Sequence, residues 1–219
     1  MILAENHLVA GMIGDVVASR HHVDQRALFD RVKAALGRIN GDMNREGPFE
    51  GLALTTGDEF QGLFPTIEEA LGVDLLLRLN LDGEIEVRTG IGWGSLSVRG
   101  SGEGYRGQSG SVWWNAREAL SKVESLSSSI GWPSSLRTWV IGIESPMERT
   151  VNSNLMLRDE ILYSMDNRTK KAVLGSLRGM TQNEIADDLG ISQPSVSKRM
   201  KRGGHALARS VELLREGLR

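Results

Sequence analysis

The sequence predicts an α+β protein, in which a mixed body of strands and helices is followed by an all-α C-terminal domain. Two observations support this prediction. Strand-like and helix-like segments alternate through residues 7–143, which is typical of helices packed on a sheet. Beyond about residue 152, only the helical spacing of apolar residues remains. We therefore divide the chain into a body (1–145), a linker helix (146–166) and a C-terminal domain (167–219).

The body is predicted as strand, helix, strand, strand, helix, strand, helix, strand. The strands are expected at 7–15, 47–57, 58–64, 84–98 and 135–143, and the helices at 22–44, 66–81 and 111–127. Thr66 is placed to cap its helix, with Glu69 positioned for a capping box. Residues 99–111 are expected to form a flexible glycine-rich loop, and residues 144–151 a linker.

The first six of these elements follow the ferredoxin-like order βαββαβ. The alternation of helices with strands through the whole body predicts helices on one face of the sheet. The βαββαβ order places the first and third strands side by side in the middle of that sheet.

Residues 182–201, QNEIADDLGISQPSVSKRMK, have the pattern of a helix-turn-helix. Ile185 and Leu189 lie four residues apart on one helical face, and Gly190 stands where the turn needs a positive φ. Ser192 and Pro194 suit the start of a second helix. The alternative is an ordinary helical hairpin that binds nothing. A further amphipathic helix after residue 204 would close this domain or pair with a second copy.

The outer face of this motif is polar and basic, which suits phosphate groups and base edges. The candidate DNA-binding residues are Thr181, Gln182, Ser192, Gln193, Ser195, Ser197, Lys198, Lys201 and Arg202. Double-stranded DNA is therefore the expected partner. One recognition helix covers only a few base pairs, so we expect a homodimer. Lys170 and Lys171 either touch the phosphate backbone or lie on a solvated helix face.

The distribution of charge agrees with this partner. Residues 166–219 hold 11 Lys/Arg against 6 Asp/Glu, a net charge of +5, so residues 1–165 carry −7 of the overall −2. The chain has no cysteine, which excludes disulfides, thiolate metal sites and a thiol nucleophile. No apolar run is long enough for a membrane span, and no signal peptide is indicated. We expect a cytoplasmic protein.

Two carboxylates follow glycines at predicted strand ends. Asp15 ends the first strand, and Asp58 lies in the hairpin before the third, so the two meet at one edge of the expected sheet. Hard oxygen ligands there would share Mg²⁺ or Mn²⁺ with the phosphates of a nucleotide. The alternative is that Gly-Asp is simply good turn chemistry. Arg20 would clamp a phosphate or form a surface ion pair. Arg88 is interpreted as structural.

The segments GDVVASR, TTGDEFQGLF, RTGIGWG and SVWWNAREAL resemble, in order and spacing, the class III nucleotidyl cyclase fold. More closely, the chain resembles the SatD family, cyclase-like bacterial proteins of which some carry a C-terminal helix-turn-helix. The resemblance covers residues 7–142. It implies a ferredoxin-like, cyclase-type sandwich, with Asp15 and Asp58 as metal ligands and Arg117 as the arginine that stabilises the transition state.

Other positions depart from the pattern of active cyclases. Trp113 stands where cyclases place a ribose-orienting asparagine, and Asn115 is two residues away from that position. Leu54 stands where adenylyl cyclases use a lysine to recognise the base. Because phosphoryl transfer depends on positioned cations and donors, these departures argue against efficient cyclisation.

Three functions are consistent with these residues. The first is a DNA-binding transcription regulator whose cyclase-like body senses a nucleotide-type ligand or mediates dimerisation. The second is a metal-dependent nucleotidyl cyclase or nucleotide hydrolase with a regulatory DNA-binding tail. The third is a catalytically inactive module that binds a nucleotide as an allosteric signal.

Overall fold

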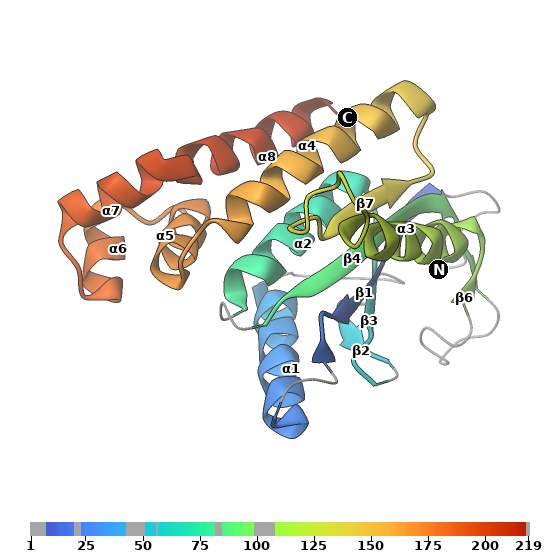
Figure 1. Ribbon diagram of the computed structural model, residues 1–219, viewed down its shortest axis with the longest axis horizontal. Helices are drawn as coiled ribbons and strands as arrows, with labels where there is room; N and C mark the ends of the chain where they lie inside the picture. The colour runs from blue at the N-terminus through green and yellow to red at the C-terminus, as the bar shows by residue number, and fades with distance from the viewer. Residues whose placement is uncertain are drawn as a thin grey trace.

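The computed structural model describes residues 8–19, 23–42, 51–55, 57–81, 85–98 and 108–217. They form a sheet covered by long helices, with a group of shorter helices beside it (Figure 1). The body comprises β1 (Leu8–Val16), α1 (Gln25–Asp42), β2 (Ala53–Leu54), β3 (Phe60–Phe64), α2 (Ile67–Asn80), β4 (Val87–Ser95), β5 (Ser97–Val98), β6 (Gln108–Ser109), α3 (Ser111–Ser127), β7 (Thr138–Ile141) and α4 (Ser145–Tyr163). The C-terminal helices are α5 (Asn167–Leu177), α6 (Gln182–Leu189), α7 (Gln193–Arg199), a kinked segment (Met200–Gly204) and α8 (His205–Gly217).

The main sheet has five strands in the order β2-β3-β1-β4-β7. All neighbours are antiparallel except β4 and β7, which are parallel. The central strand, β1, is a nearly continuous run of buried residues, as expected for a strand covered on both faces. The prediction that the first and third strands lie side by side is confirmed by the pairing of β1 with β3.

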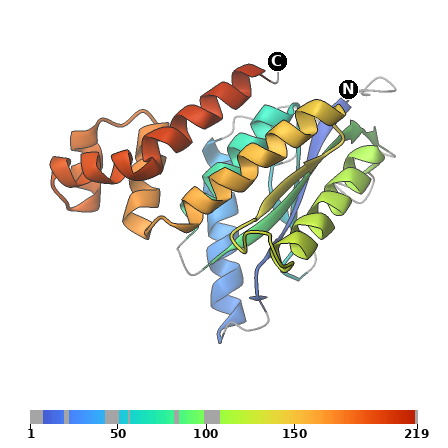
Figure 2. The same cartoon turned by 45° about the horizontal axis from the view of Figure 1, so that its top comes forward.

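The prediction of helices on one face of the sheet is wrong. Figure 2 shows α1, α2 and α4 on one face and α3 on the other. Two apolar clusters explain this arrangement, because successive residues of β1 point to opposite faces. Met12 packs with α1 and α2, whereas Ile13 packs with Ala116 and Leu120 of α3. Two helix layers therefore enclose the sheet.

Three alternate glycines of β4 allow α3 to lie unusually close to the sheet. A Cβ added to Gly90 would lie 2.2 Å from a backbone nitrogen of α3, and one added to Gly92 would lie 2.3 Å from the nitrogen of Ala116. At Gly94 the nearest atom would be Ser111 Oγ, at 2.5 Å. Backbone atoms of a packed helix cannot move aside cheaply, so no larger residue fits at Gly90 or Gly92.

A buried ionic cluster joins α2, β7 and α4. The Arg158 guanidinium donates to Asp74 at 2.6 Å, to Thr138 Oγ1 at 2.6 Å and to Asp159 at 3.0 Å. Asp159 also accepts two backbone N–H groups at the start of β7, at 2.7 and 2.8 Å, and a hydrogen bond from Arg78 of α2. Each buried charge thus has an opposite charge beside it, which offsets the cost of removing it from water.

The C-terminal helices share their apolar core with the body. Leu75 and Leu79 of α2 are buried in the same cluster as Val173, Ile185 and Val196 of the C-terminal helices. Other residues of α2 pack against the sheet. Because α2 has apolar residues around most of its surface, it contributes to both cores. The C-terminal helices therefore dock on the body through α2, and α8 runs beside α4 (Figure 1).

An ion pair holds α7 against the start of α5. Asp166 caps α5 by accepting the backbone N–H of Thr169 at 2.7 Å, and the Arg199 guanidinium donates to both carboxylate oxygens of Asp166 at 2.7 Å. The hydrogen bonds from Arg199, then those from Thr169, lower the pKa of Asp166 to about 2.

The predicted helices and strands of the body are present, but the strand predicted at 84–98 is divided into β4 and β5, which lie in different sheets. The Thr66 cap is confirmed, since its side chain accepts the N–H of Glu69 at 3.2 Å. The linker predicted at residues 144–151 is wrong, because α4 begins at Ser145. Of the predicted glycine-rich loop, residues 99–107 lie outside the described residues, and Gln108–Ser109 pair with β5. Within the described residues, no helix is both long and apolar enough to cross a bilayer.

The first prediction concerns the contact between α3 and β4. We expect Gly92→Ala to lower the free energy of unfolding by about 1–3 kcal/mol or more, because the added methyl group would meet the backbone of α3. Gly37→Ala is the matched control, since its Cβ meets nothing within 4 Å and alanine favours α1 by about 0.5–1 kcal/mol. Urea unfolding measures both variants, and equal effects would contradict the close packing.

The second prediction concerns pH. A carboxylate whose pKa is lowered by folding stabilises the protein above its unfolded pKa, and this contribution disappears as the pH falls from about 4 to about 2. Asp166→Asn keeps the cap but removes the charge. Because the pair is largely exposed, we expect a loss of a few tenths to about 1 kcal/mol at pH 7.

This difference between the native chain and Asp166→Asn should shrink toward zero as the pH falls to about 2. Asp166→Ala, which also removes the cap, should lose about 1 kcal/mol more. Melting temperatures measured from pH 6 downward test this, and a difference that is independent of pH would contradict it.

Candidate functional sites

The segment from α6 to α7 is a compact pair of short helices joined by a three-residue turn. Gly190 ends α6 with φ 61° and ψ 41°, as its sequence position predicted. Thr181 begins α6 with a reciprocal capping box, in which its side chain accepts the N–H of Glu184 and its own N–H donates to the Glu184 carboxylate at 2.7 Å. The backbone N–H and hydroxyl of Thr181 lower the pKa of Glu184.

The inner faces of these helices form an apolar core. Ile185, Ala186, Val196 and Met200 are buried together with residues of α5. This packing fixes the orientation of α7, so its other face is presented to solvent on a rigid base. Val196 is fully buried in this core.

Most of the candidate DNA-binding residues lie on the outside. Thr181, Ser192, Gln193, Lys198, Lys201 and Arg202 are exposed, whereas Gln182, Ser195 and Ser197 are half-buried. Gln193 donates to the Gln182 side-chain oxygen at 2.6 Å, which joins the first residues of α6 and α7. The hydroxyls of Ser192 and Ser195 lie 2.9 Å apart. The exposed face therefore carries amides at the start of α7 and cations at its end.

Sequence reasoning missed Arg199, which lies between Lys198 and the buried Met200. With Lys198 and Arg202 it lines a hollow between α7 and the start of α5. Its guanidinium is engaged by Asp166 and by Thr169 Oγ1, the latter at 3.0 Å. Arg199 thus positions α7, while Lys198 and Arg202 supply the basic surface. In the sequence, Lys198 and Arg199 are adjacent basic residues at the end of a predicted helix. Nothing in that pattern distinguishes the residue that pairs with Asp166 from the one that faces solvent.

Asp15 is engaged by an arginine of the neighbouring strand. The two residues are direct cross-strand partners in the β1–β4 pairing. Arg88 donates Nε to Asp15 Oδ1 at 2.9 Å and Nη2 to Oδ2 at 3.0 Å, and its Nη1 lies 3.1 Å from Glu124 of α3. Burial lowers the pKa of Arg88, but the bonds to Asp15 and Glu124 outweigh burial and raise it. Arg88 is therefore structural, as interpreted from the sequence.

Asp58 and Arg117 lie at the same edge and also have partners. Asp58 accepts the hydroxyl of Ser19 at 2.5 Å, which ties the β2–β3 hairpin to the turn after β1. Arg117 binds both carboxylate oxygens of Glu59, at 2.6 and 2.8 Å, and this hydrogen bonding raises its pKa. Asp15 adds an electrostatic contribution to Arg117. The candidate Arg20 lies outside the described residues.

This arrangement does not fit a divalent cation between Asp15 and Asp58. Both oxygens of Asp15 are occupied by Arg88, which already supplies the positive charge that a metal ion would bring. A cation would have to displace that guanidinium. In the described part of the chain, no group of three or more His, Asp or Glu side chains is arranged to hold a metal ion.

The positions that depart from active cyclases are also engaged in the fold. Asn115 donates to the backbone carbonyl of Trp93 at 2.7 Å, so its amide secures α3 to β4. Trp113 packs against the apolar clusters beneath α3, and Leu54 packs against the main core. These three side chains therefore have structural roles.

Comparison with protein-family models gives a match to the SatD family over residues 9–208. The comparison with curated proteins gives no match. The matched range includes the sheet, Asp15 at the end of β1 and the α6–α7 pair. The family model therefore spans both sites described above. The chain therefore belongs to the SatD family.

Proposed function

We propose that this protein binds double-stranded DNA through α7 and regulates transcription. The observation that carries the proposal is the polar and basic outer face of α7, held on a buried apolar core by Val196 and Met200. The positive φ of Gly190 and the capping box of Thr181 support a helix-turn-helix. In such motifs the first residues of the second helix contact base edges, so Gln193 would recognise bases and Lys198 would bind phosphate.

The body is proposed to be a ferredoxin-like, cyclase-type sandwich that senses a nucleotide-type ligand or mediates dimerisation. The chain order β1-α1-β2-β3-α2-β4 and the strand order β2-β3-β1-β4 support this assignment. Residues 1–165 carry a net charge of −7 and repel DNA, whereas residues 166–219 carry +5 and attract it. DNA would therefore approach the C-terminal helices. A homodimer would present two α7 helices about one helical turn of DNA apart. Such a regulator acts in the cytoplasm.

The third prediction tests the recognition helix. Full-length protein first selects its preferred site from randomised duplexes, and fluorescence anisotropy then measures affinity against salt. Lys198→Ala should weaken binding to all sequences and reduce the salt slope by about 0.9, because one phosphate contact is lost. Gln193→Ala should keep the salt slope but reduce discrimination between sites by about 1–3 kcal/mol.

Lys33→Ala is the control for charge, since Lys33 is an exposed cation of α1 on the body. It should bind DNA as the native chain does. Native affinity and selectivity in both α7 variants would overturn the assignment of the recognition helix. Equal losses in all three variants would instead indicate nonspecific attraction.

A metal-dependent nucleotidyl cyclase or nucleotide hydrolase is the second candidate function. It is favoured by one observation: Asp15, Asp58 and Arg117 come to one edge of the sheet. Arg88 competes with any cation for Asp15. Melting temperatures and product formation with each of the four nucleoside triphosphates and Mg²⁺ or Mn²⁺ test this candidate.

The fourth prediction follows from that competition. If the edge binds a metal–nucleotide complex, Arg88→Gln should bind it more tightly than the native chain, and Asp15→Asn should not bind it. Absence of both product and stabilisation in the native chain and in Arg88→Gln would exclude this function. Product formation that persists in Asp15→Asn would place the chemistry elsewhere.

A further inference from the structure

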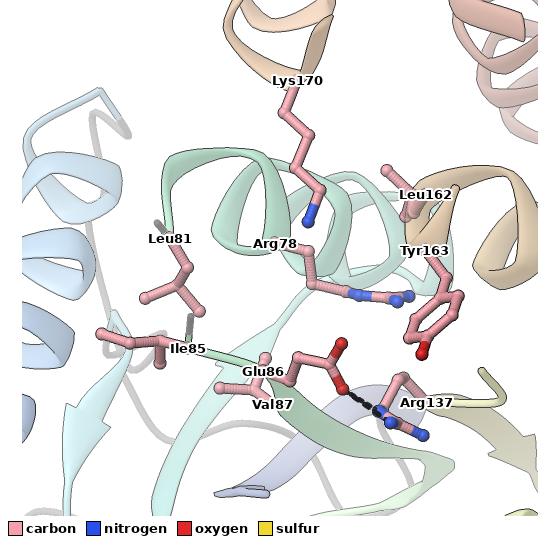
Figure 3. Close-up of a pocket in the computed structure, with 9 residues that line it drawn as sticks. All are labelled: Arg78, Leu81, Ile85, Glu86, Val87, Arg137, Leu162, Tyr163 and Lys170. Carbon is pink, nitrogen blue, oxygen red and sulfur yellow. Dashed lines mark hydrogen bonds and ion pairs between the residues drawn. The ribbon is translucent and has the colours of Figure 1, made fainter. Parts of the chain in front are cut away.

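A small pocket lies at the junction between the body and the C-terminal helices. Figure 3 shows Lys170 of α5 pointing toward Arg78 at the end of α2, with Tyr163 of α4 beside them and Glu86 and Arg137 below. The five side chains come from five separate segments of the chain. The apolar side chains that complete the lining are Leu81, Ile85, Val87 and Leu162.

Three of these five polar side chains are cations, and their pairings differ. Arg137 is fully engaged: Nε and Nη2 donate to Glu86 at 3.0 and 2.6 Å, and Nη1 donates to two backbone carbonyls. Arg78 binds Asp159 through Nη1. The Lys170 ammonium has no hydrogen-bond or ion-pair partner in the part of the chain that the structure describes. One positive charge in the pocket is therefore not matched by a direct partner.

The surroundings of Lys170 are unfavourable for its charge. Burial, followed by the positive charge of Arg78, lowers the pKa of Lys170, and only the more weakly acting Glu86 opposes this. A half-buried ammonium beside a guanidinium is stabilised when an anion enters between them. Lys170, the remaining N–H groups of Arg78 and the Tyr163 hydroxyl are all potential donors, which is the chemistry that recognises phosphate.

We propose that this pocket binds one phosphate group, donated by inorganic phosphate or by a nucleotide, between Lys170, Arg78 and Tyr163. The pocket volume of about 20 Å³ accommodates one oxygen, so the remainder of the group lies at the open mouth. A phosphate bound there bridges α2 and α4 of the body to α5, which carries α6 and α7. This site would make a phosphate-bearing molecule the ligand that the body senses. Only the link between this ligand and DNA binding rests on the proposed function.

The fifth prediction tests this site in the full chain. Phosphate is titrated at constant ionic strength, with chloride as the balancing ion, and the melting temperature is recorded. The native chain should be stabilised, by roughly 5–10 °C at a phosphate concentration about 100 times Kd. Lys170→Gln should bind phosphate at least tenfold more weakly. Without phosphate it should melt at or above the native temperature, because a repelled charge has been removed.

Lys171→Gln is the matched control, since Lys171 is the next residue of α5 and is exposed. It should respond to phosphate as the native chain does. Equal responses in the two lysine variants, or stabilisation by chloride as strong as by phosphate, would overturn the proposal. A large fall in the melting temperature of Lys170→Gln without phosphate would also overturn it, since this would make Lys170 a structural residue.

Two further experiments distinguish inorganic phosphate from a nucleotide as the ligand, and the phosphate site from the proposed DNA-binding function. ATP without metal is compared with inorganic phosphate: equal affinity through Lys170 identifies free phosphate, and tighter binding of ATP identifies a nucleotide. Hydrogen exchange of α5 should slow when the ligand binds, and unchanged exchange would contradict the bridge. If phosphate binds through Lys170 but the α7 variants keep native DNA binding, the anion site stands and the proposed function fails.

Discussion

The buried ionic cluster around Arg158 is the interaction on which the arrangement of the molecule depends. It joins α2, β7 and α4 through charged side chains buried between them. Burial lowers the pKa of Arg158, but Asp74 and Asp159 outweigh this and raise it, so the guanidinium stays charged. Removing one partner from such a cluster typically costs about 3–5 kcal/mol. The orientation of α2 is thereby fixed, and with it the surface on which the C-terminal helices dock.

Local signals in the sequence predicted the elements, whereas their layering depended on contacts distant in sequence. Thr66 and the apolar spacing behind it predict α2 because capping and periodicity act within one turn. The side of the sheet covered by α3 could not be predicted from the alternation of elements. The repeat of Gly90, Gly92 and Gly94 was the available signal, since alternate glycines leave one strand face open to a helix backbone. The start of α4 was missed because residues 145–151 have weak apolar spacing, although Pro146 in its first turn suits a helix start.

The two candidate sites differ in how far the sequence predicts them. The turn and caps of the α6–α7 pair depend on contacts within about 20 residues, so Gly190, Ser192 and Val196 predict its geometry. The surroundings of Asp15 depend on the register between β1 and β4, which places Arg88 opposite Asp15. That register decides whether the Asp15 carboxylate is free to bind a cation. Lys170 was assigned to DNA or to solvent because its helix alone was visible. Of its actual neighbours, Tyr163 lies seven residues earlier, but Arg137 and Arg78 precede it by 33 and 92 residues.

The double role of α2 limits how this protein can be divided. Leu75 and Leu79 belong to the interior of the C-terminal helices, although they precede α5 by about 90 residues. A fragment starting at α5 would lack both side chains and forfeit about 1.5–3 kcal/mol for each. A truncated body would expose the same two leucines to water. The C-terminal helices are therefore not an interchangeable cassette: recombination or engineering that moves them to another protein must also supply the apolar face of α2.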